Sequence, residues 1–368
     1  MKRIIAIALA LVFILSLTAC GENSTTASAK SISVCLASEP DTIDPALNSA
    51  VDGATLLAHL FSGLAKWSQD KDGKLQIVAD AAKELVKGVE NADGTVTYTY
   101  TLRDGLKWSD GKAVTANDYV FAWQRAASLE LAADYGYMFE VIDGYDKVTE
   151  ADDEGNPVNP DAKLNVEAVD EKTIKVTLAN AVSYWDELLA FPTYFPVRED
   201  VVADESWATK PETYICNGMY TLDSWDHNSL ITLKKNPDHP DADQVTMETI
   251  NFYLSDDANN QLSNFKNGEW LLIDDVPTNE IANLKAQYPD EFYNVGQIGT
   301  YYVCLQVLPP PLQSFPARPG SHTDFPSGTA CTAGVYTYAL SFPLIRPLPA
   351  FHPAQNEPAE KTAGSERS

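Results

Sequence analysis

The alternation of hydrophobic and polar positions predicts strands in several separate parts of the chain. A period of two indicates a strand with one buried face. In the stretch 95–102, one Val, two Tyr and one Leu alternate with four Thr, which makes it the clearest case. Strands are predicted at Ser31–Leu36, Thr95–Leu102, Thr173–Leu178 and Ile250–Leu254. Tyr301–Val307, which has no Pro and no charged residue, predicts one more strand.

Helical periodicity predicts helices between these strands, at Ala54–Leu64, after Thr115 and at Asp256–Phe265. Asp118 follows Thr115 by three residues, the spacing of a capping box in which each residue bonds the backbone N–H of the other. One face of this helix is apolar, with Tyr119, Val120, Trp123 and Ala127. The mixture of helices and strands indicates an α/β fold.

The segment "SQDKDGKLQIVA" is similar to a calcium-binding loop at Asp70, Asp72 and Gly73. Ser68 and Ala79, however, occupy the first and twelfth positions, where a calcium loop has an Asp and a bidentate Glu. We therefore predict a hairpin turn here, with Gly73 at a positive φ.

The N-terminus has the pattern of an export signal. Lys2 and Arg3 precede an apolar run, Ile4–Leu17, that is shorter than the roughly 20 residues of a membrane-spanning helix. The run ends in Leu17-Thr18-Ala19-Cys20, which resembles a bacterial lipobox. The resemblance implies a lipoprotein signal peptide at residues 1–20, a lipid on Cys20 and a flexible tether at residues 21–30. An ordinary signal peptide with a chance cysteine is the alternative.

Charge and composition change abruptly after Val307. The formal net charge is -26, and residues 308–368 contain four acidic and four basic residues, so the whole excess lies before them. Half of the 22 prolines lie in residues 308–368, whereas every tryptophan lies before them. We interpret 308–368 as an aberrant Pro-rich tail, expected to be disordered and produced by a frame shift or an assembly error. A genuine Pro-rich tail that crosses a cell wall is the alternative.

No pattern for catalysis, metal binding or nucleic-acid binding is found. The sequence has no G-x-S-x-G, H-E-x-x-H or Walker glycine loop, and the five histidines are far apart. His59 lies in an apolar helical pattern and is predicted to be packed. Cys35, Cys216 and Cys304 are predicted to be buried free thiols, although a disulfide is not excluded. The acidic charge would repel nucleic-acid phosphates. We expect no enzyme activity, cofactor or metal.

The segment "LRDGLKWSDGKAVTANDYVFAWQRA", residues 102–126, resembles the oligopeptide-binding proteins of bacterial ABC importers. Four other motifs of that family occur in the family's order along the chain. Two precede this segment, "EPDTIDP" (39–45) and "LFSGL" (60–64), and two follow it, "CNGMYTLDSWDHNSLITLKKNP" (216–237) and "FKNGEW" (265–270). The resemblance covers about residues 31–307. It implies a periplasmic-binding-protein-like fold, α/β in class, in which two lobes close around a cleft.

The resemblance also implies a domain arrangement. Residues 31–61 and 197–298 would form the first lobe, residues 62–196 a small inserted domain, and residues 299–307 the start of the second lobe. The rest of the second lobe would be missing from this chain. In the family, that lobe supplies the carboxylate that captures the N-terminal amine of the peptide and half of the backbone pairing. We therefore expect this chain to bind oligopeptides weakly or not at all.

Two regions match ligand-lining positions of the family: Asn48, Ser49, Ala50 and Val51 after "DTIDP", and Tyr135. For Tyr135, ordinary packing beside Tyr137 and Phe139 is the alternative. The partners implied are an oligopeptide ligand and an ABC permease in the cytoplasmic membrane. The chain would be a monomer, exported and lipid-anchored to the outer face of that membrane. The competing functions are a lipid-anchored adhesin or surface scaffold and, behind it, a secreted hydrolase.

Overall fold

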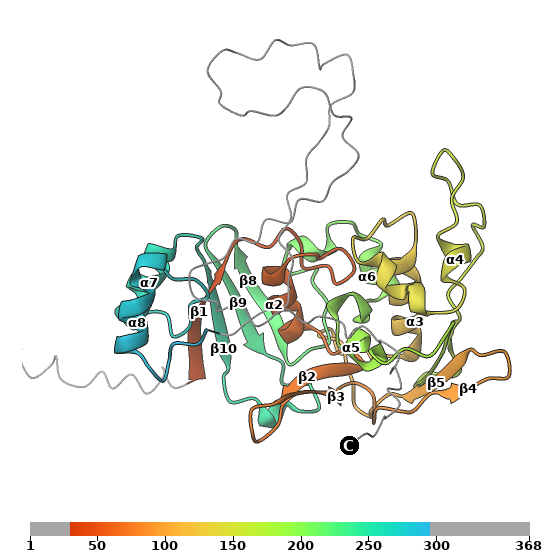
Figure 1. Ribbon diagram of the computed structural model, residues 1–368, viewed down its shortest axis with the longest axis horizontal. Coiled ribbons are helices and arrows are strands. Elements are labelled where there is room, and N and C mark those ends of the chain that lie inside the picture. The colour runs from red at the N-terminus through yellow and green to blue at the C-terminus, as the bar shows by residue number, and fades with distance from the viewer. Residues whose placement is uncertain (1–29, 295–368) are drawn as a thin grey trace, which may run out of the picture. The chain divides into compact units, whose positions relative to one another are not determined.

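The computed structural model describes residues 30–294 (Figure 1). The chain divides into two units, Met1–Gln287 and Tyr288–Ser368, and every described helix and strand lies in the first. Cys20, Cys304, the strand predicted at Tyr301–Val307 and the tail at 308–368 lie outside the described residues.

The first sheet has four strands in the order β1-β10-β9-β8. β1 pairs with β10 in parallel, and the other pairs are antiparallel. Leu271 and Leu272 lie on the outer edge of β1. The Leu271 N–H donates to the Ser33 carbonyl at 2.8 Å, and the Cys35 N–H donates to the Leu272 carbonyl at 2.9 Å. The strands are β1 (Ser31–Ala37), β8 (Tyr220–Asp226), β9 (Leu230–Lys235) and β10 (Thr249–Leu254).

The second sheet is antiparallel throughout, in the order β4-β5-β7-β6. Helix α3 (Ala116–Ala127) packs against β6 and β7. On the covered face, the alternating residues Ile174, Val176 and Leu178 are fully buried, as their spacing predicts. Its strands are β4 (Val89–Glu90), β5 (Val96–Thr101), β6 (Val166–Ala168) and β7 (Thr173–Leu178), and β2 (Ala65–Gln69) and β3 (Leu75–Ala79) form a separate hairpin.

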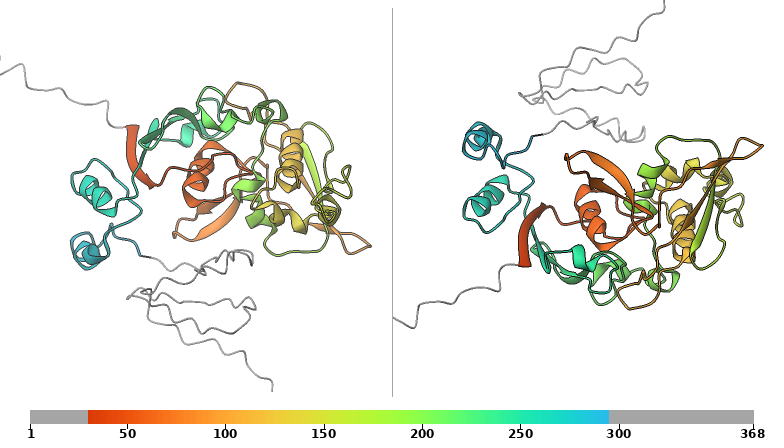
Figure 2. Two further views of the ribbon diagram at one scale, coloured as in Figure 1. Left: turned by 90° about the horizontal axis from the view of Figure 1, so that it is seen from above. Right: turned by 90° about the horizontal axis from the view of Figure 1, so that it is seen from below.

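Some helices lie beside the first sheet and others near the second (Figures 1 and 2). Helix α2 contacts β8, whereas α7 and α8 lie beside β1 and β10. The remaining helices lie near the second sheet or in the connections. Their bounds are α2 (Val51–Leu60), α4 (Tyr145–Val148), α5 (Trp185–Leu189), α6 (Glu199–Val202), α7 (Ala258–Lys266), α8 (Ile281–Gln287), η2 (Gly136–Val141), η3 (Pro192–Tyr194), η4 (Trp207–Thr209), η5 (Ala242–Gln244) and η6 (Thr278–Glu280).

The capping box predicted at the start of α3 is confirmed. The Asp118 carboxylate accepts a hydrogen bond from the backbone N–H of Thr115 at 2.7 Å, and the reciprocal bond is present. It also accepts from the indole N–H of Trp108 at 3.3 Å. Because Trp108 is buried, the cap joins the "LKWSDG" segment to the helix that follows it.

Helix α2 differs from the prediction of Ala54–Leu64 at both ends, because it spans Val51–Leu60. Phe61 adopts an extended conformation, with φ -126° and ψ 154°. The next N–H, that of Ser62, donates to the Asn217 side chain at 3.0 Å instead of continuing the helix. Contact with a distant segment therefore ends this helix, although its apolar pattern continues.

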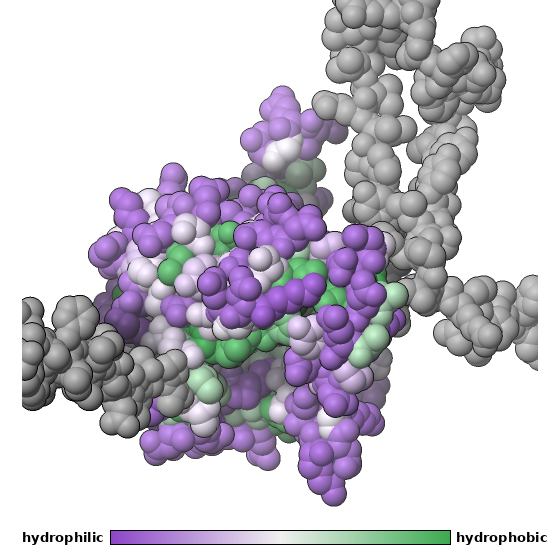
Figure 3. Space-filling model, turned by 90° about the vertical axis from the view of Figure 1, so that its left-hand side faces the viewer, coloured by the Kyte–Doolittle hydropathy of each residue, from purple (hydrophilic) through white to green (hydrophobic). Residues whose placement is uncertain are grey.

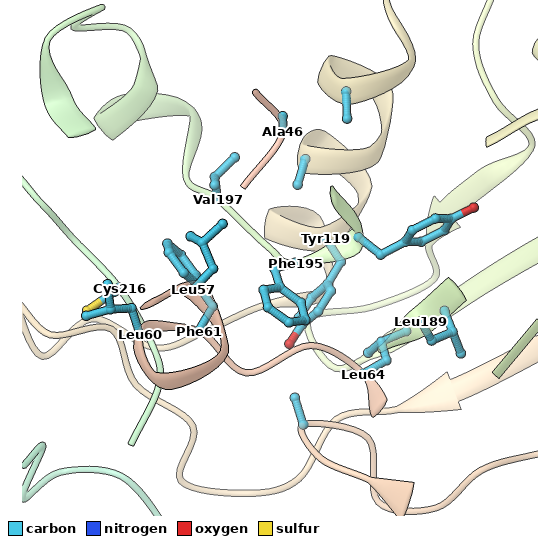
Figure 4. Packing of buried hydrophobic residues seen from close by; sticks show 14 of the residues in the cluster. Ala46, Leu57, Leu60, Phe61, Leu64, Tyr119, Leu189, Phe195, Val197 and Cys216 are labelled. Carbon is cyan, nitrogen blue, oxygen red and sulfur yellow. The ribbon is translucent and has the colours of Figure 1, made fainter. Parts of the chain in front are cut away.

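One hydrophobic core joins segments from both sides of the predicted domain boundaries (Figure 4). Leu57 and Val197, assigned above to the first lobe, pack in the same cluster as Tyr119 and Leu189 of the predicted inserted domain. The boundaries at 61/62 and 196/197 remain predictions. In residues 30–294, no helix has the length and apolar character needed to cross a bilayer.

Candidate functional site

His59 is a packed residue of α2, as predicted. Its ring centroid lies 5.6 Å from that of Phe252 and 6.0 Å from that of Tyr220, both in edge-to-face geometry. Its Nδ1 donates to the Thr55 carbonyl at 2.7 Å. Burial lowers the pKa of His59 below its ordinary value.

His239 lies in the turn before η5 and is buried. Its Nδ1 accepts from the Asp241 N–H at 3.1 Å, which leaves the proton on Nε2 to donate to the Ser62 hydroxyl at 3.3 Å. Burial is the main cause of its lowered pKa. Two nearby carboxylates, Asp80 and Asp241, act to raise the pKa, and two cations, Arg103 and Lys66, act to lower it.

Because the pKa values of these two histidines are lowered, we expect the protein to lose stability as the pH falls from 7 to 5. A histidine whose folded-state pKa is lowered takes up its proton in the unfolded state first, near pH 6.5, so acid favours unfolding. We expect the urea midpoint of wild type to fall over this range. His239→Gln should reduce that fall, because Gln does not titrate.

His227→Gln is the matched control, because the His227 side chain is 57% exposed and pairs with Glu39 at the surface. Burial raises the pKa of Asp118, so its protonation favours the folded state as the pH falls, which opposes the effect of the histidines. The test therefore compares the variants with one another and does not rely on wild type alone. A pH dependence that is the same in wild type, His239→Gln and His227→Gln would contradict this assignment.

The calcium-like segment forms the predicted hairpin turn. One Asp70 carboxylate oxygen accepts from the backbone N–H groups of Asp72 and Lys74, each at 2.9 Å, and Gly73 has φ +78°. The Asp70 carboxylate therefore closes the turn between β2 and β3. Within residues 30–294, no group of three or more His, Cys, Asp or Glu is arranged to hold a metal ion.

Two of the three cysteines predicted to be buried thiols are described, and both are buried and free. Burial raises the pKa of Cys216 to about 12, so this thiol stays protonated at neutral pH. Cys35 lies in β1, where its thiol is 3.5 Å from the Ser255 carbonyl.

The predicted segment Asn48–Val51 leads into α2, and its side chains do not all face the same way. The Asn48 side chain is 5% exposed and donates to the Ala50 carbonyl at 3.0 Å. It occupies the space beside Gly53, where a Cβ would lie 2.0 Å from its oxygen. Ser49 is exposed and Val51 is 81% exposed, while Ala50 has the extended angles φ -115° and ψ 155°.

Buried groups just before this segment hold it in place. Asp44 is 2% exposed and accepts two hydrogen bonds from the Arg125 guanidinium, at 3.1 and 2.8 Å. The same carboxylate accepts from the Ala46 N–H at 2.9 Å and from the Trp207 indole N–H at 3.3 Å. The loop, α3 and the segment around η4 therefore meet at Asp44.

Tyr135, the other predicted site residue, precedes η2 and is half-buried. Its ring packs edge-to-face on Phe191 with centroids 5.1 Å apart, and the Tyr137 ring lies 6.2 Å away. The packing that we considered as the alternative is therefore present. A ligand contact by its exposed part remains a prediction.

The C-terminal end of α3 lies next to both predicted regions. Arg125 bonds Asp44 on one side, and a Cβ on Gly136 would lie 2.9 Å from the Ala126 carbonyl on the other. The sequence pattern did not indicate a role for Asp44, Arg125 or Trp207. The signal was weak: an acid beside Pro45, and one arginine in a mainly apolar helix.

Exposed apolar side chains occur on the side of the molecule where β1, α7 and α8 lie (Figure 3). Leu271 and Leu272, which hydrogen-bond to β1 at the edge of the first sheet, are 61% and 62% exposed. Large contiguous apolar patches mark contact surfaces, whereas single exposed apolar side chains are normal on a folded protein.

Comparison with known proteins places these features in a family. The sequence profile of the bacterial extracellular solute-binding proteins, family 5 (middle region), matches residues 76–318. The oligopeptide-binding protein OppA of Bacillus subtilis is 31% identical over 300 residues, covering 77% of this chain and 52% of OppA. The probable deoxycholate-binding periplasmic protein YgiS of Escherichia coli is 30% identical over 292 residues, covering 76% of this chain and 50% of YgiS.

A solved structure agrees with these relatives. Listeria monocytogenes OppA bound to peptide matches with a TM-score of 0.57 and 29% identity, over 66% of this chain and 46% of that one. The chain spans about half the length of the curated relatives that it matches. The family profile covers most of the chain, and the mixed α/β structure is that of its solved neighbours. The chain therefore belongs to family 5 of the bacterial extracellular solute-binding proteins.

Proposed function

We propose that this chain forms one wall of a peptide-binding cleft in the substrate-binding component of an ABC importer. Its family and the oligopeptide-binding relatives support a peptide ligand. The observation that carries the proposal is the surface-facing segment Ser49–Val51. The motif resemblance of the sequence implies that this segment lines the ligand. The proposed role is binding, with no catalytic step.

In this proposal the backbone that enters α2 pairs with the end of an extended peptide as a short added strand. Ala50 already has extended angles, and Val51, the first residue of α2, has an N–H group that the helix leaves without a partner of its own. The Asn48 side chain is turned inward, so Asn48 contributes by holding the backbone. Tyr135 contributes an aromatic surface at the same end of α3.

Hydrogen exchange tests this site. The protein used is the chain fused after Val307 to the corresponding second half of Bacillus subtilis OppA, with millimolar trialanine as the probe. We expect trialanine to slow exchange at the amides of Ser49, Ala50 and Val51 and to leave the turn at 70–74 unchanged. Binding without protection at 49–51 would reject the site. No binding of trialanine, but binding of deoxycholate, would reject the peptide ligand.

The domain arrangement is proposed by resemblance to the same family. Residues 31–61 and 197–298 are proposed as the first lobe, with 62–196 as the inserted domain, and the closed form would dock on a membrane permease. Residues 31–298 alone would supply one row of hydrogen-bond partners and one apolar wall. We therefore propose that these residues alone bind peptides weakly.

Lipid anchoring is proposed from Leu17–Cys20 after the short apolar run. Changing Cys20→Ser should move the protein from the membrane fraction into the soluble or secreted fraction, or leave it unprocessed, because no other residue of the motif carries the lipid. Fractionation with immunodetection measures this. If both forms remained equally in the membrane fraction, the anchor would lie elsewhere.

A further inference from the structure

We propose that Asp44, held by Arg125 and Trp207, is a positioning residue that fixes the backbone of the peptide-contact segment Ser49–Val51. The inference rests on the proposed function for its purpose. Its structural part, the control of one segment by one carboxylate, can be tested without any peptide.

The carboxylate of Asp44 is fully used. Oδ1 accepts from Arg125 Nη1 at 3.1 Å and from the Ala46 N–H at 2.9 Å. Oδ2 accepts from Arg125 Nη2 at 2.8 Å and from Trp207 Nε1 at 3.3 Å. A carboxylate has about four acceptor positions, and here four donors take them. With the side chain of Asp44 3% exposed and that of Arg125 15% exposed, water can hardly substitute for a lost partner.

The same residue also fixes the backbone that leads to the segment. The Asp44 carbonyl accepts from the N–H groups of Leu47 at 3.1 Å and Asn48 at 2.9 Å. The preceding carbonyl, that of Ile43, accepts from the Tyr214 hydroxyl at 2.7 Å. Hydrogen bonds therefore hold both the side chain and the main chain of Asp44, and with them the turn at 44–48.

Asn48 passes this restraint on to the contact segment. Its side chain donates to the Ala50 carbonyl at 3.0 Å and packs against Gly53, which has no Cβ to displace it. Asp44 therefore holds Asn48, and Asn48 in turn holds Ala50. A segment already held in its binding conformation loses less conformational freedom when a ligand binds, which raises affinity.

The simpler interpretation is that Asp44 only stabilises the fold, and the chain contains a matched pair that separates the two. Arg103 and Asp241 form a two-bond pair with the same distances, 3.1 and 2.8 Å, and also join the predicted inserted domain to the predicted first lobe. This pair is more exposed, with side chains 26% and 16% accessible, and Asp241 is not part of the segment before α2. Disrupting it should weaken the fold without releasing Ser49–Val51.

The experiment is hydrogen exchange of the full chain without ligand, comparing wild type, Asp44→Asn and Asp241→Asn. Asparagine keeps the shape of the side chain but places an NH₂ group against donors. We expect Asp44→Asn to speed exchange at Ala46, Leu47 and Asn48 by roughly tenfold or more. Asp241→Asn should leave these amides within about twofold of wild type. Amides of β5 and β7 report global unfolding in both variants.

Trp207→Phe covers the case in which Asp44→Asn does not fold, since it removes one donor and keeps the aromatic stacking on Tyr214. It should speed exchange at the same three amides by a smaller factor. Unchanged exchange there in both Asp44→Asn and Trp207→Phe, or an equal increase in Asp241→Asn, would overturn the proposal.

The fused two-lobe protein then connects the two proposals. Asp44→Asn should weaken trialanine binding more than Asp241→Asn does. If the fused parent bound no peptide, the proposed function would fail while the exchange result still decided the role of Asp44. If the fused parent bound trialanine and Asp44→Asn bound it equally well, the positioning role would fail while the proposed function stood.

Discussion

Replacing Gly218 by alanine is expected to destabilise the folded chain by roughly 3 kcal/mol or more. The Gly218 N–H donates to the Leu60 carbonyl at 2.8 Å, so the two backbones are in direct contact. An added Cβ would lie 2.4 Å from the carbonyl carbon of Leu60 and 2.5 Å from the His59 carbonyl oxygen. These are backbone atoms at the end of α2 and cannot move aside as a flexible side chain can. Urea unfolding followed by tryptophan fluorescence measures the loss.

Gly94→Ala is the control for this substitution. Gly94 has φ +88° in the turn before β5, and no atom lies within 4 Å of an added Cβ. Its cost is limited to the backbone conformation, about 1 kcal/mol. If Gly218→Ala and Gly94→Ala shifted the urea midpoint equally, the close packing of "CNGMY" against α2 would be wrong.

The elements that the sequence predicted correctly are those whose pattern is local. Thr173–Leu178 has the predicted bounds, and Thr95–Leu102 differs from β5 by one residue at each end. Each has a strict alternation, which specifies a buried face without reference to the rest of the chain. The capping box at Thr115 is likewise contained in four residues.

The features that the sequence did not predict depend on distant residues. Asp44 meets partners 81 and 163 positions away in the chain, and no local pattern pairs them. The inward turn of Asn48 depends on the missing Cβ of Gly53, so only the folded structure separates it from Ser49. The likeness of motifs located the segment, but it could not indicate which of its side chains face outward.

The second large effect concerns affinity for peptides. In a two-lobed protein the ligand is buried on both sides, and the family resemblance assigns the carboxylate that binds the peptide amine to the second lobe. This chain spans about half of its relatives. A peptide on the first lobe alone would keep one row of hydrogen-bond partners, and its amine would remain in water.

The expected loss is several powers of ten in affinity. Each factor of ten corresponds to about 1.4 kcal/mol, and a charge-assisted hydrogen bond is about twice as strong as a neutral one. The loss of that bond adds to the loss of half of the buried contacts. Weak peptide binding, as expected here, would therefore be compatible with membership of family 5 of the bacterial extracellular solute-binding proteins.

Titration calorimetry with a random pool of tri- to pentapeptides shows whether residues of the first lobe are enough to bind a peptide. The chain of 368 residues and its fusion after Val307 to the second half of Bacillus subtilis OppA are titrated side by side. We expect clear heats of binding for the fusion and none for the chain alone at the same concentrations. Submicromolar binding by the chain alone, or no binding by a correctly folded fusion, would contradict this expectation.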